Sequence, residues 1–132
     1  MKEFHLQIVT PDGLEFDGMA ESLLVRTDDG DVQFLAGHVD YMASLGTGRA
    51  KVKVGGKDKL AAASGGFVIC SGGEVKLVAV TFEFADDIDV ERAKRSKARA
   101  EEEIRRATND KELLLAKARL RRAMSRIDVV GK

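Results

Sequence analysis

The hydrophobic and polar positions of the chain follow two different periods, one before residue 84 and one after it. In the first part, apolar side chains alternate with polar ones over short runs such as Phe4–Val9. That period of two is typical of half-buried β-strands. In the second part, apolar side chains recur every three or four residues, which is the period of a helix face. The sequence therefore predicts a β-domain over residues 1–84 and a helical domain over residues 85–132.

Turn signals divide the first part into short strands. Thr10–Gly13 places a glycine shortly after the only proline, and glycine pairs stand at 55–56, 65–66 and 72–73. Each of these segments is suited to a tight turn or a hairpin. We therefore expect an antiparallel β-sandwich or barrel of about ten short strands.

The second part predicts an antiparallel helical hairpin. Asp89 is a suitable N-cap for a first helix, and Asn109 with Glu112 matches a capping box that starts a second one. Only the short connection Thr108–Asp110 separates them, so the helices must run antiparallel. The apolar positions of the first helix are Ala93, Ala100, Ile104 and Ala107, and those of the second are Leu113, Ala116, Leu120, Ala123, Ile127 and Val130.

The expected hairpin is weak because its first apolar stripe is mostly alanine. Alanine buries little area, so two such helices are marginally stable on their own. The hairpin must dock on the β-domain, bind a partner or open, and a domain that undocks easily is suited to switching. A permanent structural tail is the alternative, and the residues alone leave both open.

Composition and charge change at the same boundary. Residues 1–84 hold 12 of the 13 glycines and all seven aromatic side chains. They carry 8 basic against 12 acidic residues, whereas residues 85–132 carry 14 against 10. The neutral total therefore combines an acidic domain with a basic one, a pattern that suggests different partners for each.

The residues that usually carry catalysis are sparse. The two histidines, His5 and His38, lie far apart in the sequence, and Cys70, the only cysteine, fits a buried strand position. The glycines lack the spacing of nucleotide-binding loops, and the basic domain has no aromatic residue on which a nucleic-acid base would stack. No segment approaches the length of a membrane span or resembles a signal peptide. We therefore expect a non-catalytic protein that binds no nucleic acid and does not insert into a membrane.

Five motifs, in order along the whole chain, resemble the epsilon family of bacterial F-type ATP synthases. They are the opening strand and turn Phe4–Gly13, the turn Leu35–His38, the strand entry Ser64–Phe67, the helix start Asp87–Lys94 and the helix end Arg121–Arg126. Each motif alone is weak, but together they are specific. One departure is Ala36, which replaces the proline usual in the family's turn and leaves the shape of that loop open.

The resemblance implies a β-sandwich that binds the gamma subunit and the c-ring, followed by a regulatory hairpin. Such a subunit belongs to the rotor that couples proton flow to ATP synthesis, at the cytoplasmic face of the bacterial cell membrane. Its hairpin would lie folded on the sandwich or extend toward the catalytic beta and alpha subunits and block ATP hydrolysis. Two alternatives remain, a free-standing ATP-sensing adaptor outside the synthase and a small enzyme.

The resemblance also implies a possible regulatory ATP site, although no cofactor is required. Some members bind ATP through a motif that Ile88–Ala93 matches in full. The folded hairpin would bring four arginines together around phosphate oxygens, to which their planar forks are suited. The alternative is a solvated basic face that meets acidic partners. The expected ATP-binding residues are Glu83, Ile88, Asp89, Arg92, Ala93, Arg99, Arg122 and Arg126.

Overall fold

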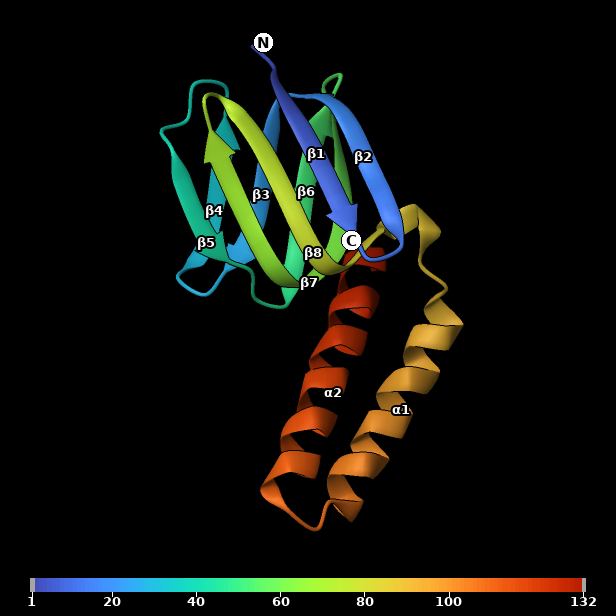
Figure 1. The fold of residues 1–132 in the computed structure, drawn as a ribbon. Coiled ribbons are helices and arrows are strands. Elements are labelled where there is room, and N and C mark those ends of the chain that lie inside the picture. Colours follow the sequence, from blue (N-terminus) through green and yellow to red (C-terminus); the bar gives the residue numbers. More distant parts are fainter. Residues whose placement is uncertain (1, 132) are drawn as a thin grey trace.

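The computed structural model describes residues 2–131 as a β-sandwich with a helical hairpin attached at one end (Figure 1). Eight strands come first, then a short 3₁₀ helix (η1) and two α-helices. The strands are β1 (Phe4–Thr10), β2 (Gly13–Ala20), β3 (Ser22–Thr27), β4 (Gly30–Leu35), β5 (Tyr41–Ser44), β6 (Gly48–Val54), β7 (Lys57–Ser71) and β8 (Glu74–Phe84). The helices are η1 (Ala85–Asp87), α1 (Val90–Arg106) and α2 (Asp110–Val130). This arrangement confirms the predicted fold class.

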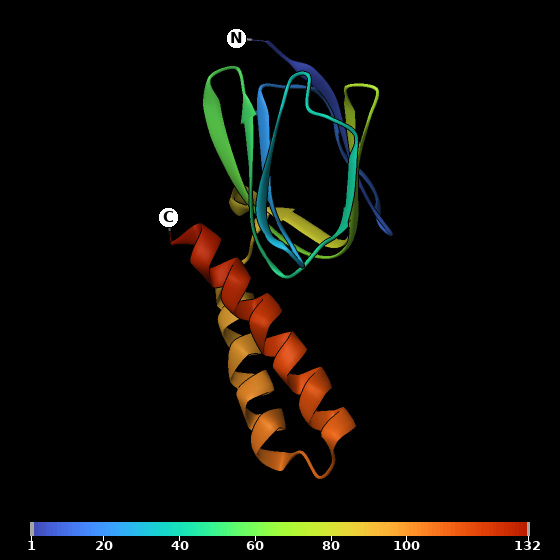
Figure 2. The same ribbon diagram turned by 90° about the vertical axis from the view of Figure 1, so that its left-hand side faces the viewer.

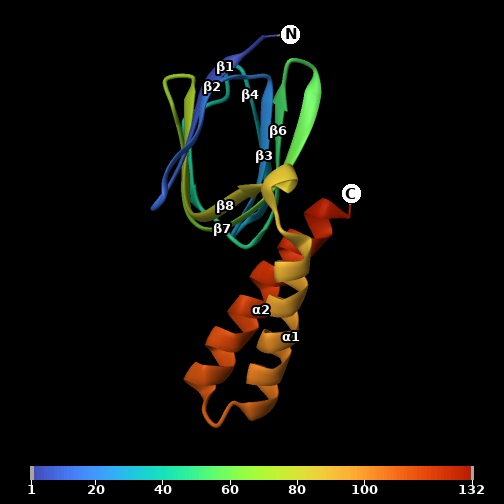
Figure 3. The ribbon, with the colours of Figure 1, turned by 90° about the vertical axis from the view of Figure 1, so that its right-hand side faces the viewer.

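The sandwich has two layers that share the long strand β7 (Figures 2 and 3). The strand order is β2-β1-β8-β7-β6-β3-β4, and β5 pairs with β7 off this path. Residues 57–63 of β7 pair with β6, whereas residues 67–70 pair with β5. The two halves of one strand therefore serve different layers. All strand pairs are antiparallel except β1 with β8, which is parallel.

The bend of β7 accounts for part of the difference between the eight strands of the described residues and the expected number of about ten. The glycine pair Gly65–Gly66 predicted a hairpin turn, and that prediction was wrong. The strand continues through both glycines, which have φ angles of 73° and 91°. Only glycine fits at position 66, because a Cβ there would lie 1.8 Å from the carbonyl oxygen of Val78. The glycines let the strand bend without breaking its pairing with β8.

One hydrophobic core fills the space between the two layers. It is built from inward side chains of the strands, including Leu6, Leu23, Phe34, Val68 and Leu77, each fully buried. Cys70 is also buried in this core, as its position in the sequence predicted.

Both predicted helix N-caps are present. The Asp89 carboxylate accepts a hydrogen bond from the Arg92 backbone N–H at 3.1 Å. The Asn109 side-chain oxygen accepts one from the Glu112 backbone N–H at 2.9 Å. The Glu112 carboxylate in turn accepts from the backbone N–H of Thr108, one residue before the position that a capping box predicts. That backbone bond, together with the Thr108 hydroxyl, lowers the pKa of Glu112.

The two helices pack through small side chains. The buried residues of α1 are Ala93 and Ala100. Helix α2 buries Ala116 and Ala123, and these four alanines form the seam between the helices. An ion pair between Arg119 and Glu103, 2.7 Å apart, joins the helices near their connection. The thin apolar contact that the sequence predicted is therefore present.

The hairpin meets the sandwich through the last turns of α2, and the rest projects into solvent (Figures 1 and 3). Val129 of α2 is 1% exposed and forms a small cluster with Ala62 of β7 and Ile88. This cluster is separate from the core of the sandwich. The hairpin is thus attached by a small second core rather than incorporated into the first.

Candidate functional site

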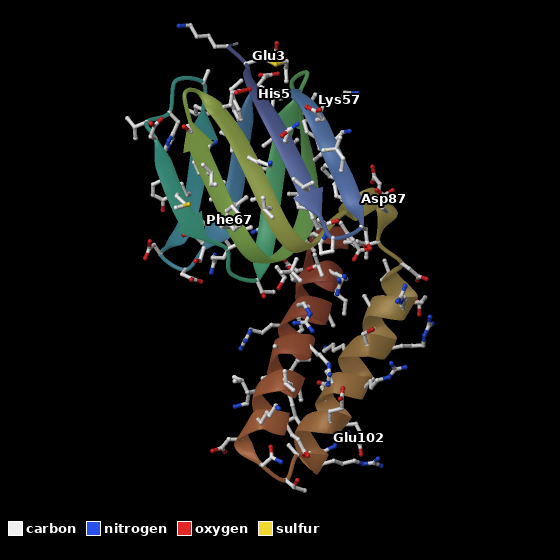
Figure 4. All side chains as sticks on the ribbon, in the orientation of Figure 1. Glu3, His5, Lys57, Phe67, Asp87 and Glu102 are labelled. Atoms are coloured by element: carbon white, nitrogen blue, oxygen red, sulfur yellow. The ribbon has the colours of Figure 1, made fainter. Side chains whose placement is uncertain are left out.

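A pocket lies at the junction between the sandwich and the hairpin. Its volume is about 370 Å³, and it opens beside the segment that leads from β8 into α1. Figure 4 labels Asp87, one of its lining residues, at this junction. Six of the eight residues predicted to bind ATP line the pocket, namely Glu83, Ile88, Asp89, Arg92, Ala93 and Arg126.

An ion pair closes one side of the pocket. The Arg126 Nε of α2 donates a hydrogen bond to the Glu83 Oε1 of β8 at 2.5 Å. The two residues are 43 positions apart in the chain, so this contact fixes the end of the hairpin against the sandwich. The Arg126 side chain is 27% exposed and that of Glu83 is 40% exposed, so water partly screens the pair.

The start of helix α1 also lines the pocket. Asp89 uses Oδ1 to cap this helix, so the role of N-cap is filled by a residue that is also expected to bind ATP. The Arg92 guanidinium lines the pocket, and no salt bridge within 4.0 Å engages it among residues 2–131. The Arg92 guanidinium is thus available to an anion, and the Arg126 guanidinium becomes available if it leaves Glu83.

The apolar residues of the pocket also serve the packing of the junction. Ile88 is 8% exposed and belongs to the cluster around Val129, and Ala93 is 3% exposed in the helix seam. Only the edges of these side chains reach the pocket.

Two of the predicted arginines lie elsewhere. Arg99 lines a separate groove near the far end of the hairpin, together with Glu102, which Figure 4 labels there. Seven helical residues correspond to a rise of about 10 Å, so sharing a face with Arg92 does not bring Arg99 to the same pocket. Arg122 lies in a narrow crevice against Ala62 and Ser64 of β7, beside Arg126 but outside the pocket. The predicted convergence of four arginines is therefore not present in this conformation.

Three lining residues were missed by the sequence reasoning: Asp12, Asp87 and Ser96. Ser96 follows Arg92 by one helical turn, so helix spacing could have identified it. Asp12 comes from the β1–β2 turn, and only the tertiary fold brings that turn to the pocket. With these residues the pocket holds four carboxylates and two guanidiniums, so its charge is more acidic than the motif alone suggests.

Neither a metal site nor a membrane span is found in the described part of the chain. Among residues 2–131, no group of three or more His, Cys, Asp or Glu side chains is arranged to hold a metal ion. No helix in that range is long and apolar enough to cross a bilayer.

Sequence comparison assigns the chain to a family. The family description "ATP synthase, Delta/Epsilon chain, beta-sandwich domain" matches residues 3–85, and the description "ATP synthase, Delta/Epsilon chain, long alpha-helix domain" matches residues 86–131. The chain belongs to the ATP synthase delta/epsilon family. Membership confirms the resemblance of the five motifs and makes the chain a structural or regulatory subunit rather than the catalytic one.

Full-length relatives agree with this assignment. The chain is 39% identical to the ATP synthase epsilon chain of Bacillus velezensis, with 99% of each chain covered. It is also 39% identical to the epsilon chain of Ruminococcus albus, over 100% of this chain and 99% of that one. These relatives support the synthase subunit and not the free-standing adaptor.

Solved structures share the fold. A chain of the Euglena gracilis mitochondrial ATP synthase complex of OSCP, F1 and c-ring superposes with a TM-score of 0.80 at 21% identity, covering 93% of this chain and 78% of that one. A chain from the Tetrahymena thermophila mitochondrial ATP synthase central stalk and c-ring superposes with a TM-score of 0.69 at 14% identity. The match covers 98% of this chain and 97% of that one. At these identities the likeness concerns the fold.

Proposed function

We propose that the chain is the epsilon subunit of the rotor of a bacterial proton-translocating ATP synthase. In this proposal residues 1–84 bind the gamma subunit and the c-ring, and residues 85–132 form a regulatory hairpin. The protein works peripherally at the cytoplasmic face of the cell membrane, held there by its partners. The observation that supports the regulatory role is the separation of the two cores, because a hairpin attached by a small cluster can detach while the sandwich stays folded.

An apolar patch on the sandwich is suited to the gamma subunit. Met42 of β5, Phe67 of β7 and Val80 of β8 are 68%, 38% and 61% exposed. They lie on strands that neighbour each other in one layer, since β7 pairs with both β5 and β8. Exposed apolar side chains gathered in this way usually mark a protein interface. A rotor subunit must hold its neighbours firmly under torque, and an apolar contact on the rigid sandwich meets that need.

The extended hairpin would inhibit ATP hydrolysis. When its contact with the sandwich is lost, the hairpin exposes Val129 and a basic surface from a segment with 14 basic against 10 acidic residues. That surface would bind acidic loops of the catalytic beta subunits, and the alpha subunits would flank it.

ATP would act on the same equilibrium as a regulatory ligand. The pocket of about 370 Å³ is within the size range of small-molecule sites, and Arg92 and Arg126 are placed to meet phosphate oxygens. Arg126 must exchange Glu83 for the nucleotide, and the apolar edges of Ile88 and Ala93 lie within the same pocket. A ligand that binds only the folded hairpin stabilises it by mass action and so opposes inhibition.

Reconstitution with gamma and the catalytic subunits tests the regulatory role. Full-length protein should suppress ATP hydrolysis more than residues 1–84 alone, which keep the proposed binding surface. Equal hydrolysis rates would contradict the inhibitory role. The rotor role requires that both forms co-purify with gamma, and failure of both to do so would contradict it.

Titration of the isolated full-length protein with millimolar ATP tests the pocket. Amide NMR signals around Asp89 and Arg92 should shift with saturation, and Arg92→Gln or Arg126→Gln should weaken binding. Arg99→Gln is the matched control, because Arg99 lies outside the pocket. If ATP changes neither the spectrum nor the melting temperature, the site is absent. If Arg99→Gln weakens binding as much as Arg92→Gln, ATP binds a differently folded hairpin.

A further inference from the structure

A larger groove lies on a different face of α2, between this helix and the outer surface of β3 and β6. Its volume is about 590 Å³, and none of its lining residues belongs to the pocket around Asp89. Two structural domains form it, and neither domain contains it alone. Its cationic lining residues are Arg26 of β3, Arg49 and Lys51 of β6, and Arg121 of α2.

The register of the sheet determines the floor of the groove. Leu24 of β3 pairs with Lys51 of β6, which in turn pairs with Leu60 of β7. Paired residues point to the same face of a sheet, so these three side chains form one row across the outer surface. Arg49 lies two residues from Lys51, and that spacing puts it on the same face.

The segment Gly46–Thr47–Gly48, which matches no nucleotide-binding loop, supports Arg26 in this groove. A Cβ at Gly48 would lie 3.0 Å from the Cβ of Arg26, and one at Gly46 would lie 3.4 Å from its Cγ. The absence of side chains at both glycines therefore leaves room for the stem of Arg26. Its Nε donates a hydrogen bond to Asp31 Oδ1 at 2.6 Å, which fixes the head group and balances its charge.

Helix α2 contributes the opposite wall. Arg121, Met124, Ser125 and Asp128 follow the spacing i, i+3, i+4, i+7, which is one face of a helix. The hydroxyl oxygen of Ser125 is buried and has no hydrogen-bond partner among residues 2–131. Buried polar groups usually have a partner, so an unpaired hydroxyl beside the groove is unusual.

The charge of the groove is unbalanced. No salt bridge within 4.0 Å engages Arg49, Lys51 or Arg121 in the described range, whereas Asp31 already holds Arg26. Asp128 is the one further carboxylate in the lining. Three cations therefore face one acid, and they repel each other unless an anion lies among them.

We propose that this groove is a second ligand site, which binds the phosphate groups of a small molecule. Arginine and lysine side chains from two domains meet phosphate oxygens. Such a ligand contacts both β6 and α2, so it also holds the hairpin on the sandwich, a consequence that rests on the proposed mobility of the hairpin. Leu24, Leu60 and Met124 give the groove an apolar part, which would accept an organic group carried by the phosphate.

The test is an NMR titration of the full-length protein with inorganic pyrophosphate and, separately, with uridine diphosphate. Saturable shifts are expected at the amides of Thr47, Arg49 and Ser125 with both. Tighter binding of uridine diphosphate would identify an organic phosphate as the ligand, and equal binding would identify the free anion. The variant with Arg49→Gln and Arg121→Gln should bind both at least roughly tenfold more weakly.

Matched variants separate this site from the pocket proposed for ATP. Arg92 lies outside the groove, so Arg92→Gln should leave pyrophosphate binding unchanged. The single variant Arg49→Gln changes no residue of the hairpin. It replaces the double variant in this test if the double variant loses the contact between the hairpin and the sandwich, and it should also weaken binding. Shifts that grow linearly without saturation, or that are confined to the residues around Asp89, would overturn the proposal. Neither result would affect the ATP pocket, which the Arg92 and Arg126 variants test.

Discussion

Arg126 and Glu83 form the ion pair that joins the last turns of α2 to the end of β8, with 2.5 Å between Nε and Oε1. Together with the cluster around Val129, it holds the hairpin against the sandwich. Both residues also line the pocket proposed for ATP. The same side chains therefore determine whether the hairpin stays docked and whether a nucleotide can bind.

Removing this ion pair should loosen the hairpin without unfolding the sandwich. Because both side chains are partly exposed, we expect Glu83→Gln to cost about 0.5–1 kcal/mol of docking free energy. Hydrogen exchange should become faster in α2 and remain unchanged in β3. A double-mutant cycle with Arg126→Gln checks that the effect belongs to the pair, and additive effects of the two substitutions would contradict the prediction.

The bend of β7 makes a prediction about Gly66. Gly66→Ala should destabilise the sandwich by more than about 2 kcal/mol, because the residue has a left-handed φ and its Cβ would collide with backbone. Gly72→Ala is the matched control, since Gly72 also has a positive φ but its Cβ would meet nothing within 4 Å. Chemical denaturation of both variants measures the difference. Equal losses would show that the bend does not depend on close backbone approach.

Local signals in the sequence were enough for most of the fold. Asp89 and Asn109 were identified as N-caps because a cap depends on the next three residues, and the strand at Phe4–Val9 was identified from its alternating apolar side chains. Gly65–Gly66 was misjudged because a glycine pair permits both a hairpin turn and a bent strand. Only the pairing of β7 with two different neighbours decides between them.

The pocket was harder to predict for the same reason. The motif Ile88–Ala93 is local, and four of its residues line the pocket as expected. Asp12 and the orientation of Arg122 depend on where the β1–β2 turn and β7 lie, which no local pattern gives. Arg99 follows Arg92 by seven residues, so it lies too far along α1 to line the same pocket.

The sandwich contains a contact that responds to pH. The His5 ring donates from Nδ1 to Glu74 at 2.9 Å and from Nε2 to Asp17 at 2.5 Å, which requires the protonated ring. These bonds, first that to Glu74, raise the pKa of His5 above its ordinary value of 6.5. The bond to His5 lowers the pKa of Asp17 below its ordinary value of 3.8.

The sign of the pH effect follows from these directions. The contribution of His5 to stability is full below pH 6.5 and is lost as the pH rises through its raised pKa. The contribution of Asp17 is present above pH 3.8 and is lost as the pH falls through its lowered pKa. Wild type should therefore be more stable relative to His5→Gln at pH 5.5 than at pH 9, by thermal unfolding. An unchanged difference between these two pH values would contradict the assignment.

The small cluster at the junction should control docking separately from global stability. Val129→Ala removes two methyl groups from a side chain that packs against Ala62 and Ile88, so we expect a loss of about 1–2 kcal/mol from the docked state. Because this cluster is separate from the sandwich core, the strands should keep their unfolding midpoint. Val68→Ala is the matched control, since it removes the same atoms from the core and should lower that midpoint. Hydrogen exchange by residue separates the two effects, with Val129→Ala speeding exchange in α2 only. If Val129→Ala also lowered protection in β3 and β6, the hairpin and the sandwich would unfold as one cooperative unit, and a hairpin that detaches from a folded sandwich would be ruled out.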